Sequence, residues 1–122
     1  MTKAYLFLNA ALYLLLAIWC TVKHAQTSRA SGFVALDNSG HSEYLVIYGG
    51  LQLGLAVFFW YLGAHAEHHR VGVLFSLMLY APIVLYRVAT VIAFSPVSGI
   101  TMGIAALETL LLISALLLFF AR

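Results

Sequence analysis

The chain has 122 residues, of which 64% are hydrophobic and only 8% are charged, and its formal net charge is +2. A soluble domain contains about 25% charged residues. This composition therefore excludes an ordinary water-soluble domain and predicts an integral membrane protein. The basic residues form no run, so we expect no nucleic-acid partner. The single cysteine, Cys20, excludes an intrachain disulfide.

Four apolar segments account for most of the chain. Each is close to the ~20 residues that an α-helix needs to cross the hydrocarbon core of a bilayer. None shows the alternating pattern of a membrane strand. The segments lie at residues 4–22, 43–64, 71–94 and 99–120. We therefore predict an all-α, polytopic membrane protein, with residues 1–122 forming one transmembrane domain, a four-transmembrane-helix bundle. Its first partner is the lipid bilayer.

The charges between the segments predict the orientation. Lys3, Arg70 and Arg122 fall on one side of the four segments, whereas Lys23 and Arg29 fall on the other. Cytoplasmic loops carry an excess of Lys and Arg. Three basic residues against two therefore favour a multi-pass protein with both termini in the cytoplasm.

Two opposite charges lie inside the apolar segments, Arg87 in the third and Glu108 in the fourth. Helical side chains point toward the N-terminus of their own helix. In an antiparallel pair of helices Arg87 and Glu108 therefore point toward each other. An unpaired charge in hydrocarbon is costly, so we predict a buried Arg87–Glu108 ion pair. The alternatives are an Arg87 that extends to the lipid headgroups and a neutral Glu108 hydrogen-bonded at a helix interface.

Helical phase adds further residues to predicted inward faces. Taken segment by segment, these faces comprise Tyr5, Asn9 and Tyr13; Glu43, Gly50, Gly54 and Tyr61; Ser76, Tyr80 and Arg87; and Thr101, Glu108 and Ala115. The spacing of Gly50 and Gly54 predicts close approach of another helix. The candidate binding site is Arg87, Glu108, Glu43 and Tyr80. Two interpretations remain open: polar contacts that hold the helices together, or a pocket for a small ligand or lipid headgroup.

A histidine cluster lies between the second and third segments. His65, His68 and His69 are three and four residues apart, a spacing that brings side chains together on a helix. Imidazoles so placed can bind a metal ion or haem. No cysteine or second carboxylate completes a familiar ligand set, and a solvated cap explains the cluster more simply. We predict no cofactor and no metal, and we keep these histidines as the metal candidates.

The stretch SEYLVIYGGLQLGLAVFFWYLG, residues 42–63, resembles the signature of the DUF4345 family of small bacterial four-helix membrane proteins. That family has a glutamate ahead of a tyrosine and paired glycines, an arginine in the third helix and a glutamate in the last. The matching residues here are Glu43, Tyr48, Gly49, Gly50, Arg87 and Glu108. The resemblance covers nearly the whole chain. It implies a bacterial inner-membrane protein with four helices, and it implies no particular activity.

Three functions remain open from the sequence. The one it favours is a non-enzymatic protein that binds a small lipophilic or anionic ligand, or a partner subunit, around Arg87, Glu108 and Glu43. The second is an accessory or structural subunit of a homo-oligomer or a larger membrane complex. The third is a membrane enzyme that acts on a lipid or isoprenoid by carboxylate acid–base chemistry. That enzyme would need a second proton carrier near Glu108, for which Tyr80 is the candidate.

Overall fold

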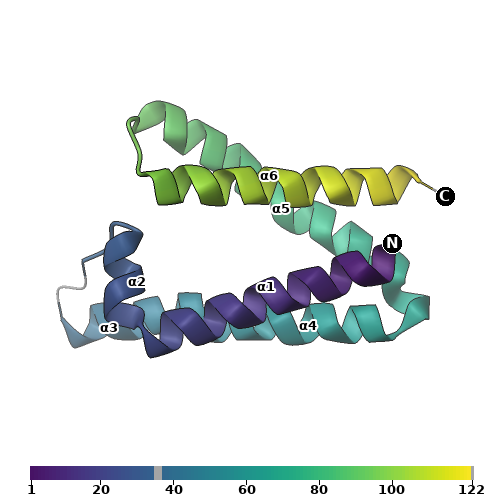
Figure 1. Cartoon of the computed structure of the whole chain (residues 1–122), viewed down its shortest axis with the longest axis horizontal. Helices are drawn as coiled ribbons and strands as arrows, with labels where there is room; N and C mark the ends of the chain where they lie inside the picture. Colours follow the sequence, from purple (N-terminus) through teal and green to yellow (C-terminus); the bar gives the residue numbers. More distant parts are fainter. Residues whose placement is uncertain (35–36, 122) are drawn as a thin grey trace.

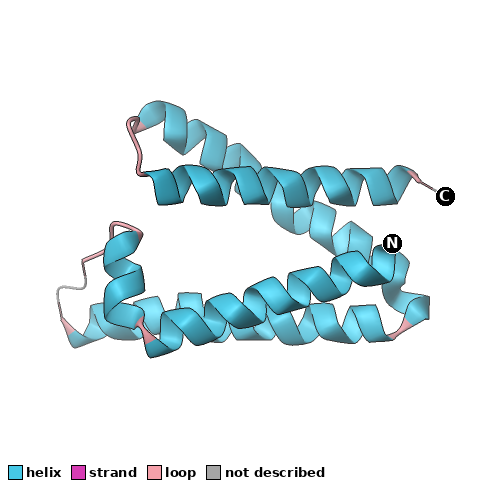
Figure 2. Cartoon of the chain, viewed as in Figure 1, coloured by secondary structure: helices cyan, strands magenta, loops and turns pink. Residues whose placement is uncertain are grey.

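The computed structural model describes residues 1–34 and 37–121 (Figure 1). Every regular element in these two ranges is helical, which confirms the predicted all-α class (Figure 2). Four helical segments are long and apolar enough to cross a membrane: Thr2–Val22, Asn38–Ala64, Ala66–Ala93 and Gly99–Phe120. Arg122, which entered the charge count for the orientation, lies outside the described residues.

The first and fourth of these segments are continuous α-helices, and the second and third are composite. The elements in chain order are α1 (Thr2–Val22), α2 (His24–Ala30), α3 (Asn38–Leu45), the π-helical turn η1 (Val46–Leu51), α4 (Gln52–Ala64), the 3-10 turn η2 (Ala66–His68), α5 (His69–Ala93) and α6 (Gly99–Phe120). Two of the helices begin at a side-chain cap. The Asp37 carboxylate accepts a hydrogen bond from the Gly40 N–H, and the Ser98 hydroxyl accepts one from the Thr101 N–H.

The helices pack as two antiparallel pairs. α1 lies along α4, and α5 lies along α6. Figure 1 shows that the two pairs lie close together at the end that carries the N-terminus and spread apart toward the other end. We call these the closed end and the open end. At the open end α2 and α3 lie opposite the turn between α5 and α6, so the four long helices form a bundle that widens in one direction.

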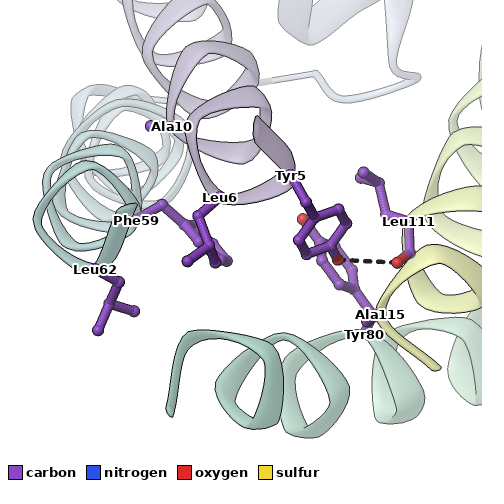
Figure 3. Close-up of a cluster of buried hydrophobic side chains, with 8 residues drawn as sticks. All are labelled: Tyr5, Leu6, Ala10, Phe59, Leu62, Tyr80, Leu111 and Ala115. Atoms are coloured by element: carbon purple, nitrogen blue, oxygen red, sulfur yellow. Dashed lines mark hydrogen bonds between the residues drawn. The ribbon is translucent and has the colours of Figure 1, made fainter. Parts of the chain in front are cut away.

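The core lies where the two pairs meet (Figure 3). It contains buried side chains from all four long helices: Tyr5, Leu6, Ala10, Phe59, Leu62, Tyr80, Leu111 and Ala115. Leu6 is fully buried, and its methyl groups would lie 2.8 Å from a Cβ added to Gly72. Glycine at the beginning of α5 therefore lets the α1 side chain pack directly against the α5 backbone.

The inward face predicted for the second segment is wrong. All four residues assigned to it are exposed, namely Glu43, Gly50, Gly54 and Tyr61. The buried residues lie on roughly the opposite side of the helix: Gly49, Ala56, Phe59, Leu62 and Gly63. A Cβ added to Gly50 or Gly54 would meet nothing within 4 Å, so neither glycine is at a close helix contact. Apolar packing against α1 determines which face of the second segment points inward. Glu43 does not need to point inward, because it is exposed near a helix end.

Candidate functional site

The predicted ion pair is present between α5 and α6. Arg87 Nε donates to Glu108 Oε1 at 2.8 Å, and Arg87 Nη2 donates to Glu108 Oε2 at 3.1 Å. This two-point geometry is the strongest that an arginine and a carboxylate form. The expected burial is only partial, because 31% of the Arg87 side chain and 16% of the Glu108 side chain are exposed. Arg87 is thus held by the neighbouring helix and still accessible.

Helix geometry explains why these two side chains meet. Arg87 lies six residues before the end of α5 at Ala93, and Glu108 lies nine residues after the start of α6 at Gly99. At 1.5 Å per residue the two Cα atoms are about 9 Å and about 14 Å from the turn. Each side chain points toward the N-terminus of its helix. Arg87 therefore points away from the turn and Glu108 toward it, which closes the difference of about 5 Å.

The Arg87 guanidinium keeps unused hydrogen-bond donors. A guanidinium has five N–H groups, and Glu108 takes two of them. The Arg87 side chain makes no other hydrogen bond within residues 1–34 and 37–121. Three N–H groups are therefore left without an acceptor in the described part of the protein. They belong to a side chain that is exposed enough to reach a ligand.

Tyr48 is a neighbour of this pair that our sequence analysis did not include in the candidate site. Its half-buried side chain, on η1, lies close enough to interact electrostatically with both Arg87 and Glu108. The Tyr48 hydroxyl has no hydrogen-bond partner among the described residues. The signal that could have found it was the tyrosine before the paired glycines. In the sequence, that tyrosine contributes only to the family resemblance.

An aromatic cluster surrounds Tyr48 toward the open end. The Tyr48 ring stacks on the Tyr44 ring with 4.6 Å between centroids, and Phe33 packs edge-on against both. The Tyr44 hydroxyl donates to Thr27 Oγ1 on α2 at 2.8 Å. The cluster therefore connects α2, α3 and η1, and it fixes the orientation of the Tyr48 ring.

The π-helical turn η1 positions Tyr48 relative to α1. A Cβ added to Gly49, the residue after Tyr48, would lie 2.7 Å from Thr21 Oγ1 on α1. Only glycine allows η1 to approach α1 so closely. Single π-helical turns within longer helices are found frequently at functional sites. Here the turn carries Tyr48, which interacts electrostatically with the ion pair.

Tyr80 belongs to a different polar cluster, nearer the closed end. The Tyr13 hydroxyl donates to the Tyr80 hydroxyl at 2.9 Å, and the Tyr80 hydroxyl donates to Asn9 Oδ1. Asn9 Nδ2 donates to the Tyr5 carbonyl oxygen at 2.9 Å. The Tyr5 hydroxyl donates to the Leu111 carbonyl oxygen at 2.9 Å (Figure 3). We call these residues the tyrosine network, and they connect α1 with α5 and α6.

The structure does not bring two of the predicted residues to the ion pair. Tyr80 is 1% exposed and makes no hydrogen bond to Arg87 or Glu108 in the described part of the chain. Glu43 is exposed on α3 and forms no ion pair within residues 1–34 and 37–121. The candidate site is therefore the hydrogen-bonded pair Arg87 and Glu108, and Tyr48 is an electrostatic neighbour of both members.

The histidine candidates lie beyond the other end of the second segment and do not converge on one point. His65 Nδ1 is 2.8 Å from the Tyr61 carbonyl oxygen, and His69 Nε2 is 3.0 Å from the Gly63 carbonyl oxygen. The His65 and His68 rings pack on Tyr61. Within the described ranges no three side chains of the metal-binding types are grouped to hold an ion.

Comparison with known proteins found no similar protein from which this geometry could be interpreted. No protein-family model matches the chain, and no curated protein and no solved structure shows significant similarity to it. The function therefore has to be argued from the site itself.

Proposed function

We propose that this chain is an integral membrane protein that binds a small lipophilic or anionic ligand at Arg87. Four long apolar helices support the membrane assignment. Their outer surfaces carry large apolar side chains such as Leu15, Leu85 and Leu117, which are 65%, 71% and 67% exposed. Water disfavours so many apolar side chains on one surface, whereas the hydrocarbon core of a bilayer accommodates them.

The unused donors of Arg87 are the observation that supports a ligand. Glu108 lies about 14 Å along α6, which is near the middle of a hydrocarbon core about 30 Å thick. A polar group without a partner at that depth costs several kcal/mol. Three N–H groups of a partly exposed guanidinium therefore need an acceptor. A bound molecule with an oxygen atom at this position satisfies them.

The amino-acid sequence supports the proposed location and orientation. The resemblance to the DUF4345 family favours the bacterial inner membrane. The excess of Lys3, Arg70 and Arg122 over Lys23 and Arg29 favours cytoplasmic termini. With this orientation the open end of the bundle faces the periplasmic side. The ligand then enters either from that side or from the surrounding lipid.

The two other functions receive unequal support. A partner subunit is favoured by α6, which buries only Leu111 and Ala115 within the chain. A lipid-facing helix presents the same surface, so we keep assembly as the second candidate. The acid–base enzyme receives less support, because it needs Tyr80 as a second proton carrier for Glu108. The Tyr80 hydroxyl bonds to Tyr13 and Asn9 rather than to Glu108.

The test is native mass spectrometry of the protein extracted from its membrane in a mild detergent. We expect a defined extra mass on the unaltered protein and its loss in Arg87→Gln. Thr90→Val is the matched control, because Thr90 lies on α5 close to Arg87 and its hydroxyl bonds only to its own helix. Circular dichroism and elution volume show whether each variant folds. An unaltered protein without adduct, or an adduct retained by folded Arg87→Gln, overturns the proposal.

A further inference from the structure

We propose that the ligand of this site is an uncharged lipophile that presents a carbonyl oxygen to Arg87. This inference rests on the proposed function, since it names the chemical class of the ligand for the same site. It narrows the two classes named above, lipophilic or anionic, to one. Three features of the protein favour this class: the charge balance of the pair, the charges at the open end, and the groups beside the guanidinium.

The charge balance disfavours an anion. Glu108 already neutralises Arg87 through two hydrogen bonds. An anion that binds the remaining N–H groups would lie about 6 Å from the Glu108 carboxylate, across the width of the guanidinium. At an effective dielectric constant of about 20, this like charge offsets about a hundredfold of the affinity that the Arg87 charge would otherwise give an anion. An anion must also lose its hydration to enter this site, whereas a neutral oxygen accepts the same N–H groups without that cost and without the repulsion.

The open end carries no net charge that would attract an anion. The connector between α1 and α3 contains Lys23 and Arg29, and these are matched by Asp37 and Glu43. The turn between α5 and α6, residues 94–98, contains no charged residue. Association of a charged ligand is accelerated where one sign of charge lines the approach. The balance at the open end instead suits a ligand that arrives without charge.

The groups beside the guanidinium suit a carbonyl compound. A carbonyl oxygen has two lone pairs, and the free N–H groups of Arg87 are the donors available to it. The stacked rings of Tyr44 and Tyr48, with Phe33 at their edge, give a flat apolar surface for the rest of the molecule. Two membrane sources share this chemistry: a prenylated quinone, whose carbonyl belongs to a ring, and a neutral glycerolipid, whose carbonyl belongs to an ester.

The experiment is a binding titration with the full chain in an uncharged detergent. The neutral probes are a decyl-substituted benzoquinone and dioctanoylglycerol, and the charged probe is decanoate. We expect saturable binding of at least one neutral probe and weaker binding of decanoate. Binding of the quinone alone identifies the ring carbonyl, and binding of the glycerolipid alone identifies the ester. Arg87→Gln should weaken the neutral probe at least tenfold, whereas Thr90→Val should leave it unchanged.

Glu108→Gln gives the sharpest result, because it removes the negative charge and keeps a group of the same size. We expect decanoate to bind this variant at least tenfold more tightly than the unaltered protein. If that variant does not fold, Arg87→Lys serves instead. Arg87→Lys keeps the charge but not the free guanidinium donors, so it should weaken the neutral probe by about tenfold.

The outcomes separate this inference from the proposed function. Decanoate binding more tightly than both neutral probes to the unaltered protein overturns the inference and leaves the ligand site standing. The same holds if no probe binds while an Arg87-dependent mass is still carried from the membrane. If no probe binds and no such mass is found, the proposed function fails as well.

Discussion

The two polar clusters of this bundle make an instructive comparison. The tyrosine network lies near the closed end, and its central residues Asn9 and Tyr80 are 0% and 1% exposed. The ion pair lies nearer the open end, and its arginine is 31% exposed. Within the described residues the buried side-chain polar atoms all have partners, whereas three donors of the accessible Arg87 have none. The polar residues of these apolar helices thus fall into two groups. Those of the tyrosine network hold the helices together, whereas Arg87 has donors that are free to bind a ligand.

The largest effect should come from breaking the tyrosine network. Tyr80→Phe removes one hydroxyl and leaves Tyr13 and Asn9 Oδ1 without their partner in a buried place. A buried group that loses its hydrogen bond costs about 1–3 kcal/mol. We expect this loss in the free energy of unfolding, measured by titration with a denaturing detergent. The amount of ligand carried from the membrane should stay the same in the folded protein.

A smaller effect should follow from moving η1. Gly49→Ala places a methyl group against Thr21 Oγ1, at 2.7 Å in the unrelaxed structure. Overpacking of this kind costs about 1–3 kcal/mol, and we expect the lower end, because η1 lies near the end of the bundle that widens. The shift of Tyr48 should also weaken ligand binding.

Thr21→Ala is the matched partner for this change. It removes the hydroxyl that meets the new methyl group, and the Thr21 Cβ lies 4.0 Å away, which is ordinary contact. The double variant should therefore recover both stability and binding. Gly103→Ala is the control, since an added Cβ there meets nothing within 4 Å. Equal losses for Gly49→Ala and Gly103→Ala would contradict the close approach of η1 to α1.

The smallest effect is expected at Glu43. The side chain is exposed and forms no ion pair in the described ranges, so Glu43→Gln should change the free energy of unfolding by less than about 0.5 kcal/mol. Ligand binding should also be unaffected. A strong loss of ligand binding in Glu43→Gln would contradict this placement. It would mean that Glu43 belongs to the site and that the second segment is rotated relative to this structure.

The sequence predicted some parts of the molecule well because local rules determine them. Helix lengths follow from apolar runs, and the Arg87–Glu108 pair follows from a short turn together with the direction of helical side chains. The inward positions of Asn9, Ser76, Tyr80 and Ala115 followed from phase in the same way. Each of these features depends on one helix, or on two helices joined by a turn.

Other parts could not be predicted because they depend on contacts across the bundle. The inward face of the second segment was assigned from the shared helical phase of its polar and small residues, but the packing of the opposite face against α1 determines it. The bonding of Tyr80 to Tyr13 and Asn9 depends on where α1 lies against α5, which no single helix encodes. Tyr48 lies on the π-helical turn, which sets its position relative to the ion pair. Apolar periodicity in the sequence does not reveal such a turn.

The most direct test compares the two clusters in one experiment. Native mass spectra would be recorded for the unaltered protein, Tyr80→Phe and Arg87→Gln, all extracted from the same membrane. We predict the same bound mass per protein for the unaltered chain and folded Tyr80→Phe, and none for folded Arg87→Gln. Loss of the bound mass in Tyr80→Phe, together with its retention in Arg87→Gln, would contradict the assignment of binding to Arg87.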